Sequence, residues 1–158
     1  MRILIVHEAV TGGGGVESYL TELIPALRAR GHDVAFLHHN SRSETGVIRL
    51  EFPGVPSASV VDDGLEVALA TMRAWRPDVC FSHNMRYLGV EERLMAEWPV
   101  AKMMHGFFGT CLGGHKAVTF PSVEPCTRLC GPACLPVYLP RHCGQLRPLV
   151  MVQQYRWH

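Results

Sequence analysis

The sequence predicts an α/β fold in which a parallel sheet is flanked by helices. Residues 2–7 (RILIVH) are apolar without alternation, which is typical of a strand covered on both faces. A glycine loop at 11–15, an amphipathic helical pattern at 16–30 and a second apolar run at 33–38 follow. Strand, glycine loop, helix and strand in this order indicate a βαβ unit. This pattern continues to residue 105, after which the sequence becomes rich in Cys, Gly and Pro.

The boundaries of the first helix and of the later elements follow from local signals. Pro25 lies inside the helical pattern and predicts a kink or a local break, and Gly31 predicts the end of the helix. Strands are expected at 46–52, 79–82 and 100–105, helices at 65–75 and 91–98, and a turn-rich stretch at 53–59. This alternation favours an α/β fold with a parallel sheet.

Composition and charge exclude several classes of protein. The 158 residues suit a single domain, 1–158, and 47% hydrophobic with 18% charged residues is enough apolar material for a core. A formal net charge of +1 argues against a nucleic-acid binder. No apolar run approaches the ~20 residues of a membrane span, and the opening strand does not resemble a signal peptide. We therefore expect a cytoplasmic protein whose cysteines are thiols or metal ligands rather than disulfides.

A segment rich in Cys, Gly and Pro occupies residues 106–143. Between Gly106 and Gly144 lie six of the 15 Gly, five of the 11 Pro and five of the six Cys. Such a density of helix and strand breakers predicts a loop-rich insertion within the domain. Residues 141–158 begin a last helix, against which Pro148 argues, and the chain then stops without a strand to pair with it. The domain therefore looks truncated.

The glycine loop at the first helix is a candidate anion site. Gly12, Gly13, Gly14 and Gly15 follow a strand and open a helix, whose first amides have no partner within the helix and carry partial positive charge. The pattern is not the dinucleotide fingerprint, because Ser18 stands where its third glycine would be. It is not a P-loop either. A flexible turn with no ligand is an equally good interpretation.

Four segments in order resemble group 1 glycosyltransferases, the retaining GT-B enzymes often called family 4. Gly14 to Glu17 match the Gly-Gly-x-Glu-type loop of that family, and residues 31–34 (GHDV) match its helix exit. The segments RPDVCFSHN and VAKMMHGFFGTC resemble the strand that begins Pro-Asp-Val and the strand that ends in a His-Gly turn. The resemblance runs from the start of the chain to the His-Gly turn and, more loosely, to Cys143.

The resemblance implies a function and a set of donor-site residues. Enzymes of that family have two Rossmann-like domains, of which the first mainly holds the acceptor and the second mainly holds the nucleotide sugar. It implies that Gly12 to Gly15, with Glu17, lie near the donor diphosphate. His105 would be the catalytic residue near the transferred sugar, unless it is a structural histidine at a strand end. For Glu17, a first-turn carboxylate stabilised by the helix dipole is the stronger interpretation.

The resemblance also implies partners. His83 and Lys116 are candidate acceptor-binding residues, although a solvated loop lysine is the default for Lys116. The other histidines considered are expected to be surface or packing residues: His7, His32, His38, His39 and His115. The expected ligands are a nucleotide sugar and a sugar or lipid-linked acceptor, with peripheral membrane contact possible. The Glu motif of the donor domain does not follow His158, so we expect an acceptor half that is not fully active alone. A truncated reading frame, a pseudogene product and one half of a two-chain enzyme, completed by a separate donor-domain chain, are the alternatives.

The cysteines allow a second class of function. Cys126, Cys130 and Cys134 are separated by three residues each, and Cys143 supplies a fourth thiol. This spacing is compatible with structural zinc, while disulfides and plain buried thiols remain alternatives. A small metal-binding or redox module is therefore one rival to a glycosyltransferase half. A non-catalytic interaction subunit is another.

Overall fold

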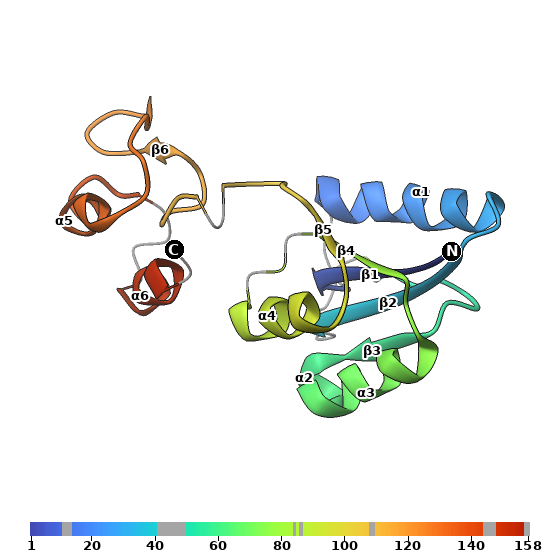
Figure 1. The fold of residues 1–158 in the computed structure, drawn as a ribbon. Coiled ribbons are helices and arrows are strands. Elements are labelled where there is room, and N and C mark those ends of the chain that lie inside the picture. The colour runs from blue at the N-terminus through green and yellow to red at the C-terminus, as the bar shows by residue number, and fades with distance from the viewer. Residues whose placement is uncertain are drawn as a thin grey trace. The chain divides into compact units, whose positions relative to one another are not determined.

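The computed structural model describes residues 1–10, 14–40, 50–83, 85, 87–107, 110–143 and 148–156. The chain divides into two compact units, Met1–Met103 and Met104–His158. The sequence predicted one domain over 1–158 with 106–143 as a segment within it. Each unit is described by itself (Figure 1).

The first unit is built on a five-stranded sheet in the order β3-β2-β1-β4-β5. Every neighbouring pair in it runs parallel. The strands are β1 (Arg2–Ala9), β2 (Asp33–Asn40), β3 (Ser57–Ser59), β4 (Val79–His83) and β5 (Val100–Met103). The predicted α/β fold with a parallel, Rossmann-like sheet flanked by helices is thereby confirmed.

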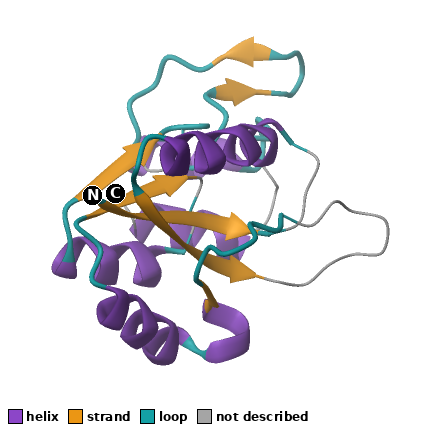
Figure 2. Ribbon diagram, turned by 90° about the vertical axis from the view of Figure 1, so that its right-hand side faces the viewer, coloured by secondary structure: helices purple, strands orange, loops and turns teal. Residues whose placement is uncertain are grey.

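Helices cover both faces of this sheet, which explains the unbroken apolar runs of the central strands. Ile3 and Ile5 point to one face, where they pack with α1 (Gly15–Ala29). Leu4 and Val6 point to the other face, where α3 (Leu65–Trp75) and α4 (Leu88–Glu97) lie. Figures 1 and 2 show the strands between helices on two sides. Alternate residues of β1 therefore serve two separate cores.

Helix α1 follows its sequence signals with one exception. Leu20 and Ile24 form its buried stripe, as the helical spacing predicts. The helix ends where expected, since Gly31 has a φ of 80° and its amide donates to the carbonyl of Arg28 at 2.9 Å. Contrary to the expected local break, the helix runs unbroken through Pro25, which is exposed to solvent.

One short strand lies in the stretch 53–59 that the sequence predicted to be turn-rich, and one short helix lies directly after it. Strand β3 pairs with β2, and α2 (Val60–Asp63) follows it directly. Ser59 begins that helix, because its hydroxyl accepts from the amide of Asp62 at 3.2 Å. The predicted strand at 46–52 lies largely outside the described residues, and 50–52 are not in a strand. Strand β3 forms because it pairs with β2, and the local sequence pattern did not predict this pairing.

The second unit contains short elements joined by turns and loops. They are β6 (Ala117–Val118), β7 (Glu124–Pro125), a 3₁₀ turn (Pro132–Cys134), α5 (Leu135–Tyr138) and α6 (Pro148–Arg156). Strands β6 and β7 are antiparallel. Pro148 is the first residue of α6, a position that tolerates proline because its amide has no partner within the helix. Among the described helices of the whole chain, none combines the length and apolar character that crossing a bilayer requires.

Candidate functional site

The strand order of the first unit marks one place as suited to binding. The chain moves from β1 to β2 and β3 on one side, then returns to β4 and β5 on the other. The strands beside this reversal are β1 and β4, and their carboxyl ends carry His7 and His83, paired in register. Open α/β sheets bind ligands at such a switch point. Helix α1 begins just beyond β1, so its amino end belongs to this region.

His7 connects the two strands with the first turn of α1. Its ring is 1% exposed; Nδ1 lies 2.9 Å from the carbonyl oxygen of His83, and Nε2 lies 3.3 Å from Oε1 of Glu17. The two contacts place the imidazole between a strand-end carbonyl and the first turn of α1, and the tautomer decides which nitrogen donates. His7 was predicted to be a surface or packing residue. Its place at a strand end, ten residues before Glu17, was the available signal.

Gly14 and Gly15 form the amino end of α1. Gly14 is the N-cap residue, and its carbonyl accepts the first helical bond from Ser18 at 3.2 Å. Glycine has no side chain that could cap the next amides, and the amides of residues 15–17 have no partner within the helix itself. A Cβ added to Gly14 would lie 2.7 Å from Oε2 of Glu17, whereas one added to Gly15 would meet nothing within 4 Å. The Glu17 carboxylate therefore lies against Gly14 while it also contacts His7.

A second polar group ties β4 and β5 to α4. The Ser82 hydroxyl donates to Oε1 of Glu91 at 2.7 Å, and Nζ of Lys102 donates to Oε2 at 2.6 Å. Ser82 and Glu91 are buried. Both carboxylate oxygens are thus engaged, which suits a group that fixes the positions of these elements.

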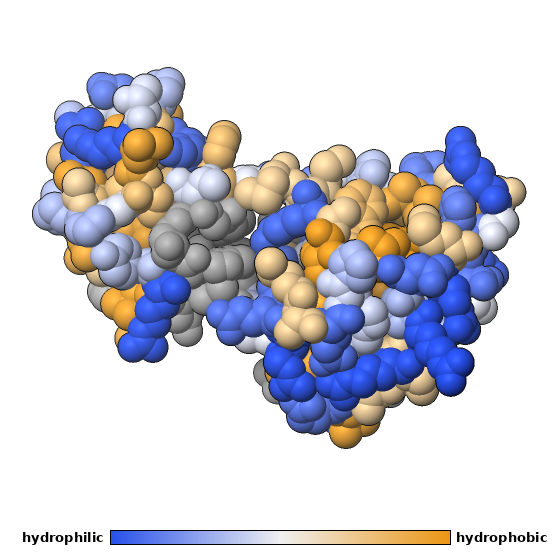
Figure 3. Space-filling view, viewed as in Figure 1, coloured by the Kyte–Doolittle hydropathy of each residue, from blue (hydrophilic) through white to orange (hydrophobic). Residues whose placement is uncertain are grey.

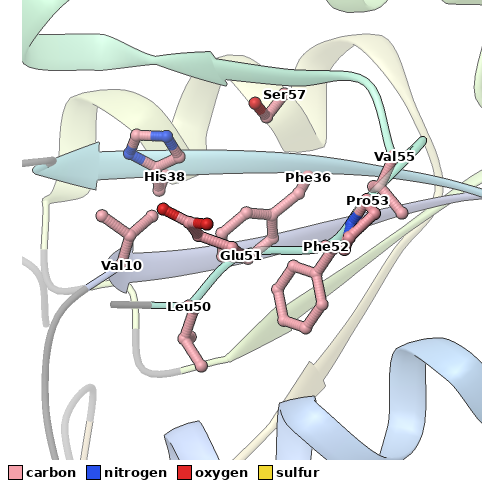
Figure 4. A pocket seen from close by; sticks show the side chains of 9 residues that line it. All are labelled: Val10, Phe36, His38, Leu50, Glu51, Phe52, Pro53, Val55 and Ser57. Carbon is pink, nitrogen blue, oxygen red and sulfur yellow. The ribbon is translucent and has the colours of Figure 1, made fainter. Parts of the chain in front are cut away.

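A cavity of about 310 Å³ opens beside the carboxyl half of β2. Figure 4 shows the His38 ring and the Glu51 carboxylate at one end, beside Val10, and Phe52 at the other. The wall also includes Phe36, whose ring meets that of Phe52 edge to face at 5.4 Å. The cavity combines an apolar wall with an acid and an imidazole, which is a common composition for a small-molecule site. The sequence singled out neither His38 nor Glu51 for binding.

The remaining predicted residues of the first unit either lie outside the described residues or are buried. Gly12 and Gly13 lie outside the described residues. His83 is fully buried, with Phe81 at 4.2 Å and Tyr19 at 5.6 Å between ring centroids, so an acceptor could reach the ring only if a neighbour moved.

Two predicted residues belong to the second unit. His105 is exposed there. The Lys116 ammonium donates to the carbonyl of Arg128 at 2.6 Å, which holds the side chain within its own loop.

Residues 13–122 match the model of Glycosyltransferase Family 4. The chain belongs to that family. No curated protein and no solved structure matched the chain. The resemblance noted in the sequence is confirmed, and the first unit is the Rossmann-like sheet of a glycosyltransferase module.

The cysteines of this family member differ between the two units. Cys80 is fully buried and forms no disulfide. Its burial, helped by the charge of Glu97, raises the pKa of its thiol to about 12. The five cysteines of the second unit are free and half-buried. Among the described residues, no three His, Cys, Asp or Glu side chains are already placed to hold a metal ion. The predicted zinc site at Cys126, Cys130, Cys134 and Cys143 stays a prediction.

Proposed function

We propose that this chain is the acceptor-binding half of a nucleotide-sugar-dependent glycosyltransferase, in which the amino end of α1 contacts the donor diphosphate. The observation that carries the proposal is the position of Gly14 and Gly15. They open a helix at the switch point of the sheet, and no side-chain hydrogen bond caps its first amides. Membership of Glycosyltransferase Family 4 supports sugar transfer as the chemistry.

The first amides of α1 fit the charge that develops in sugar transfer. As the glycosidic bond to phosphate breaks, the leaving nucleoside diphosphate gains negative charge. Amides already aimed at that oxygen stabilise the transition state without rearranging, and one such donor contributes roughly 10²- to 10³-fold in rate. The amide of Gly15 is the candidate that we single out, because the space that a side chain at this position would occupy is open.

Glu17 acts on this site indirectly. A carboxylate and a diphosphate are both anions, so direct contact between them would be repulsive. Glu17 instead contacts His7 with one oxygen and lies against Gly14 with the other. Its proposed part is to fix the loop through which the diphosphate is bound.

The acceptor and the second half of the enzyme complete the proposal. The cavity beside His38 and Glu51 offers an apolar wall and hydrogen-bonding groups to a sugar or lipid-linked acceptor. His105, His83 and Lys116 remain proposed contacts for the transferred sugar and the acceptor. A donor domain that binds the nucleotide closes over the module, whether on the same polypeptide or on another chain, and a lipid-linked acceptor would bring the enzyme to a membrane surface.

A single amide can be removed to test the diphosphate site. In Gly15→Pro the first helical residue loses its N–H, yet proline is favoured at this position. The preceding Gly14 has φ −92° and ψ 177°, the extended conformation that a residue before proline prefers. Gly15→Ala keeps the amide and is the matched control. The helix should therefore persist in both variants.

The assay is a titration of the ¹⁵N-labelled chain with inorganic pyrophosphate, UDP and GDP, followed by amide chemical shifts. We expect the largest shifts at residues 15–17. Affinity should be similar in Gly15→Ala and about tenfold weaker or more in Gly15→Pro, the effect of one hydrogen bond to a charged group. Equal affinity in both variants, or shifts that avoid residues 15–17, would contradict the assignment.

A further inference from the structure

The cavity beside β2, called the β2 cavity from here on, has a polar end and an apolar end. Figure 4 shows the His38 ring and the Glu51 carboxylate at one end and Phe52 at the other. The apolar lining residues outnumber the polar ones: they are Val10, Phe36, Leu50, Phe52, Pro53 and Val55. A ligand that fills this cavity therefore has one part that forms hydrogen bonds and one part that is apolar.

Hydrogen bonds hold the chain segment that walls the β2 cavity. At the start of the segment, the amide of Leu50 donates to the carbonyl of Val10 at 2.6 Å. At its end, the amide of Phe36 in β2 donates to the carbonyl of Pro56 at 2.8 Å. Between these two points, a guanidinium on α1 donates to the carbonyl of Pro53 at 2.8 Å. The cavity is therefore formed before a ligand arrives, and binding does not have to order its wall.

The polar end favours hydroxyl groups over anions. His38 is 6% exposed and lines the cavity, and an imidazole can donate at one nitrogen and accept at the other. Its ring can therefore bond a hydroxyl in either role. The Glu51 carboxylate can only accept, which suits a hydroxyl that donates, and its negative charge repels a phosphate.

The polar end lies one strand away from the proposed diphosphate site. In the parallel pair of β1 and β2, His38 is in register with His7, whose ring contacts Glu17 of α1. Adjacent strands are about 4.8 Å apart. Each histidine stands two positions after a core residue of the α1 face, Ile5 in β1 and Phe36 in β2, so both rings lie on that face. Hydroxyls held at the polar end are thus on the same side of the sheet as the amino end of α1.

The volume of the β2 cavity limits the size of its ligand. The cavity measures about 310 Å³. An apolar cavity of about 150 Å³ holds one benzene molecule. The β2 cavity therefore has room for about two groups of that size, one sugar ring and one compact apolar group. A long apolar chain would extend beyond its walls.

We propose that the β2 cavity selects an uncharged glycoside as the acceptor. The sugar hydroxyls bind at His38 and Glu51. The apolar group, an aromatic ring or one of similar size, lies beside Phe36 and Phe52, whose rings already meet edge to face at 5.4 Å. A sugar carried on a lipid phosphate is disfavoured, because its charge would meet the Glu51 carboxylate. That this ligand is the acceptor rests on the proposed function.

Three small ligands of matched structure test the selection. The ¹⁵N-labelled full chain is titrated with phenyl β-D-glucoside, phenyl phosphate and methyl β-D-glucoside, and its amide chemical shifts are followed. We expect phenyl β-D-glucoside to shift residues 36–38 and the non-proline residues of 50–57, and to bind at least tenfold more tightly than either other ligand. Equal binding of phenyl phosphate would overturn the charge selection, and equal binding of methyl β-D-glucoside would overturn the apolar subsite. If phenyl β-D-glucoside leaves these amides unshifted up to its solubility limit, the cavity is not the site.

Glu51→Gln tests the source of the charge selection. The variant keeps the size of the side chain and an oxygen that accepts, but it removes the charge. The preference for phenyl β-D-glucoside over phenyl phosphate, taken as the ratio of the two affinities, should fall at least tenfold. An unchanged ratio would overturn the part assigned to Glu51. The wild-type comparison of the three ligands decides the proposal even if this variant does not fold.

A matched control lies on the opposite side of the sheet. Helices α3 and α4 cover that side, where Arg73 donates to Glu97 at 2.6 Å, and Figure 3 shows mostly hydrophilic side chains over α3. Glu92 of α4 is exposed and lies outside the β2 cavity. Glu92→Gln removes the same charge and should leave the ratio unchanged. A ratio that falls equally in both variants would show an effect of net charge alone and would overturn the assignment.

Failure of this proposal is distinguishable from failure of the proposed function. The diphosphate site is tested with pyrophosphate at residues 15–17, and the β2 cavity is tested with uncharged ligands at residues 36–38 and 50–57. A chain that binds pyrophosphate but not phenyl β-D-glucoside loses only the acceptor assignment made for the cavity. A chain that binds phenyl β-D-glucoside in the cavity but no pyrophosphate keeps the selective site and loses the diphosphate site.

Discussion

Gly14→Ala should destabilise the chain, whereas Gly15→Ala, one residue away, should not. An added Cβ at residue 14 would lie 2.7 Å from the Glu17 carboxylate, about 0.7 Å short of an ordinary contact at 3.4 Å. The carboxylate must retreat, and its 3.3 Å contact with His7 has no length to spare. Losing that bond costs about 0.5–1.5 kcal/mol, and alanine is a poorer N-cap than glycine, so the total is about 1–2 kcal/mol. Gly15→Ala has open space and should gain roughly 0.5 kcal/mol.

Urea unfolding followed by circular dichroism measures these changes, with both variants compared at equal m-values. A double-mutant cycle with Glu17→Ala isolates the cause. In that background Gly14→Ala should cost only its N-cap part, which leaves a coupling energy of about 1 kcal/mol. If Gly14→Ala costs the same with and without the Glu17 carboxylate, the close approach is not what requires glycine at residue 14.

Two further predictions concern the first unit. The Arg73 guanidinium, hydrogen-bonded to Glu97 at 2.6 Å, lowers the pKa of that carboxyl, so its contribution to stability is present at neutral pH and is lost as pH falls below about 4.5. The stability difference between wild type and Arg73→Met, measured by urea unfolding across pH 7 to 3, should therefore shrink as pH falls; a difference that grows on acidification would refute this. The pKa of about 12 at Cys80 leaves on the order of one thiol in 10⁴ ionised at pH 8. Native wild type and native Cys80→Ser should then consume the same equivalents of a thiol reagent, and one equivalent less in the variant would contradict the burial argument.

Much of the candidate site could be anticipated from sequence, but its internal contacts could not. The glycine loop and Glu17 are adjacent in the chain, so a strand followed by an amphipathic helix was enough to place them at a helix start. The contact of His7 with His83 spans 76 positions and depends on β1 pairing with β4. The place of His7 at a strand end was the available signal, but by itself it does not distinguish a contact with Glu17 from simple packing. The burial of His83, whose ring packs against that of Phe81, likewise depends on the pairing of β1 with β4.

The sequence by itself determined the elements that are specified by residues close together in the chain. The unbroken apolar strands, the buried stripe of α1 and the turn at Gly31 each depend on neighbours within a few residues, so reading the chain was sufficient. Tertiary structure decided the sheet order, the short β3 strand and the bond between His7 and Glu17. These features depend on which strands, far apart in the sequence, pair with one another. The packing of helices on both faces of the sheet determines that pairing.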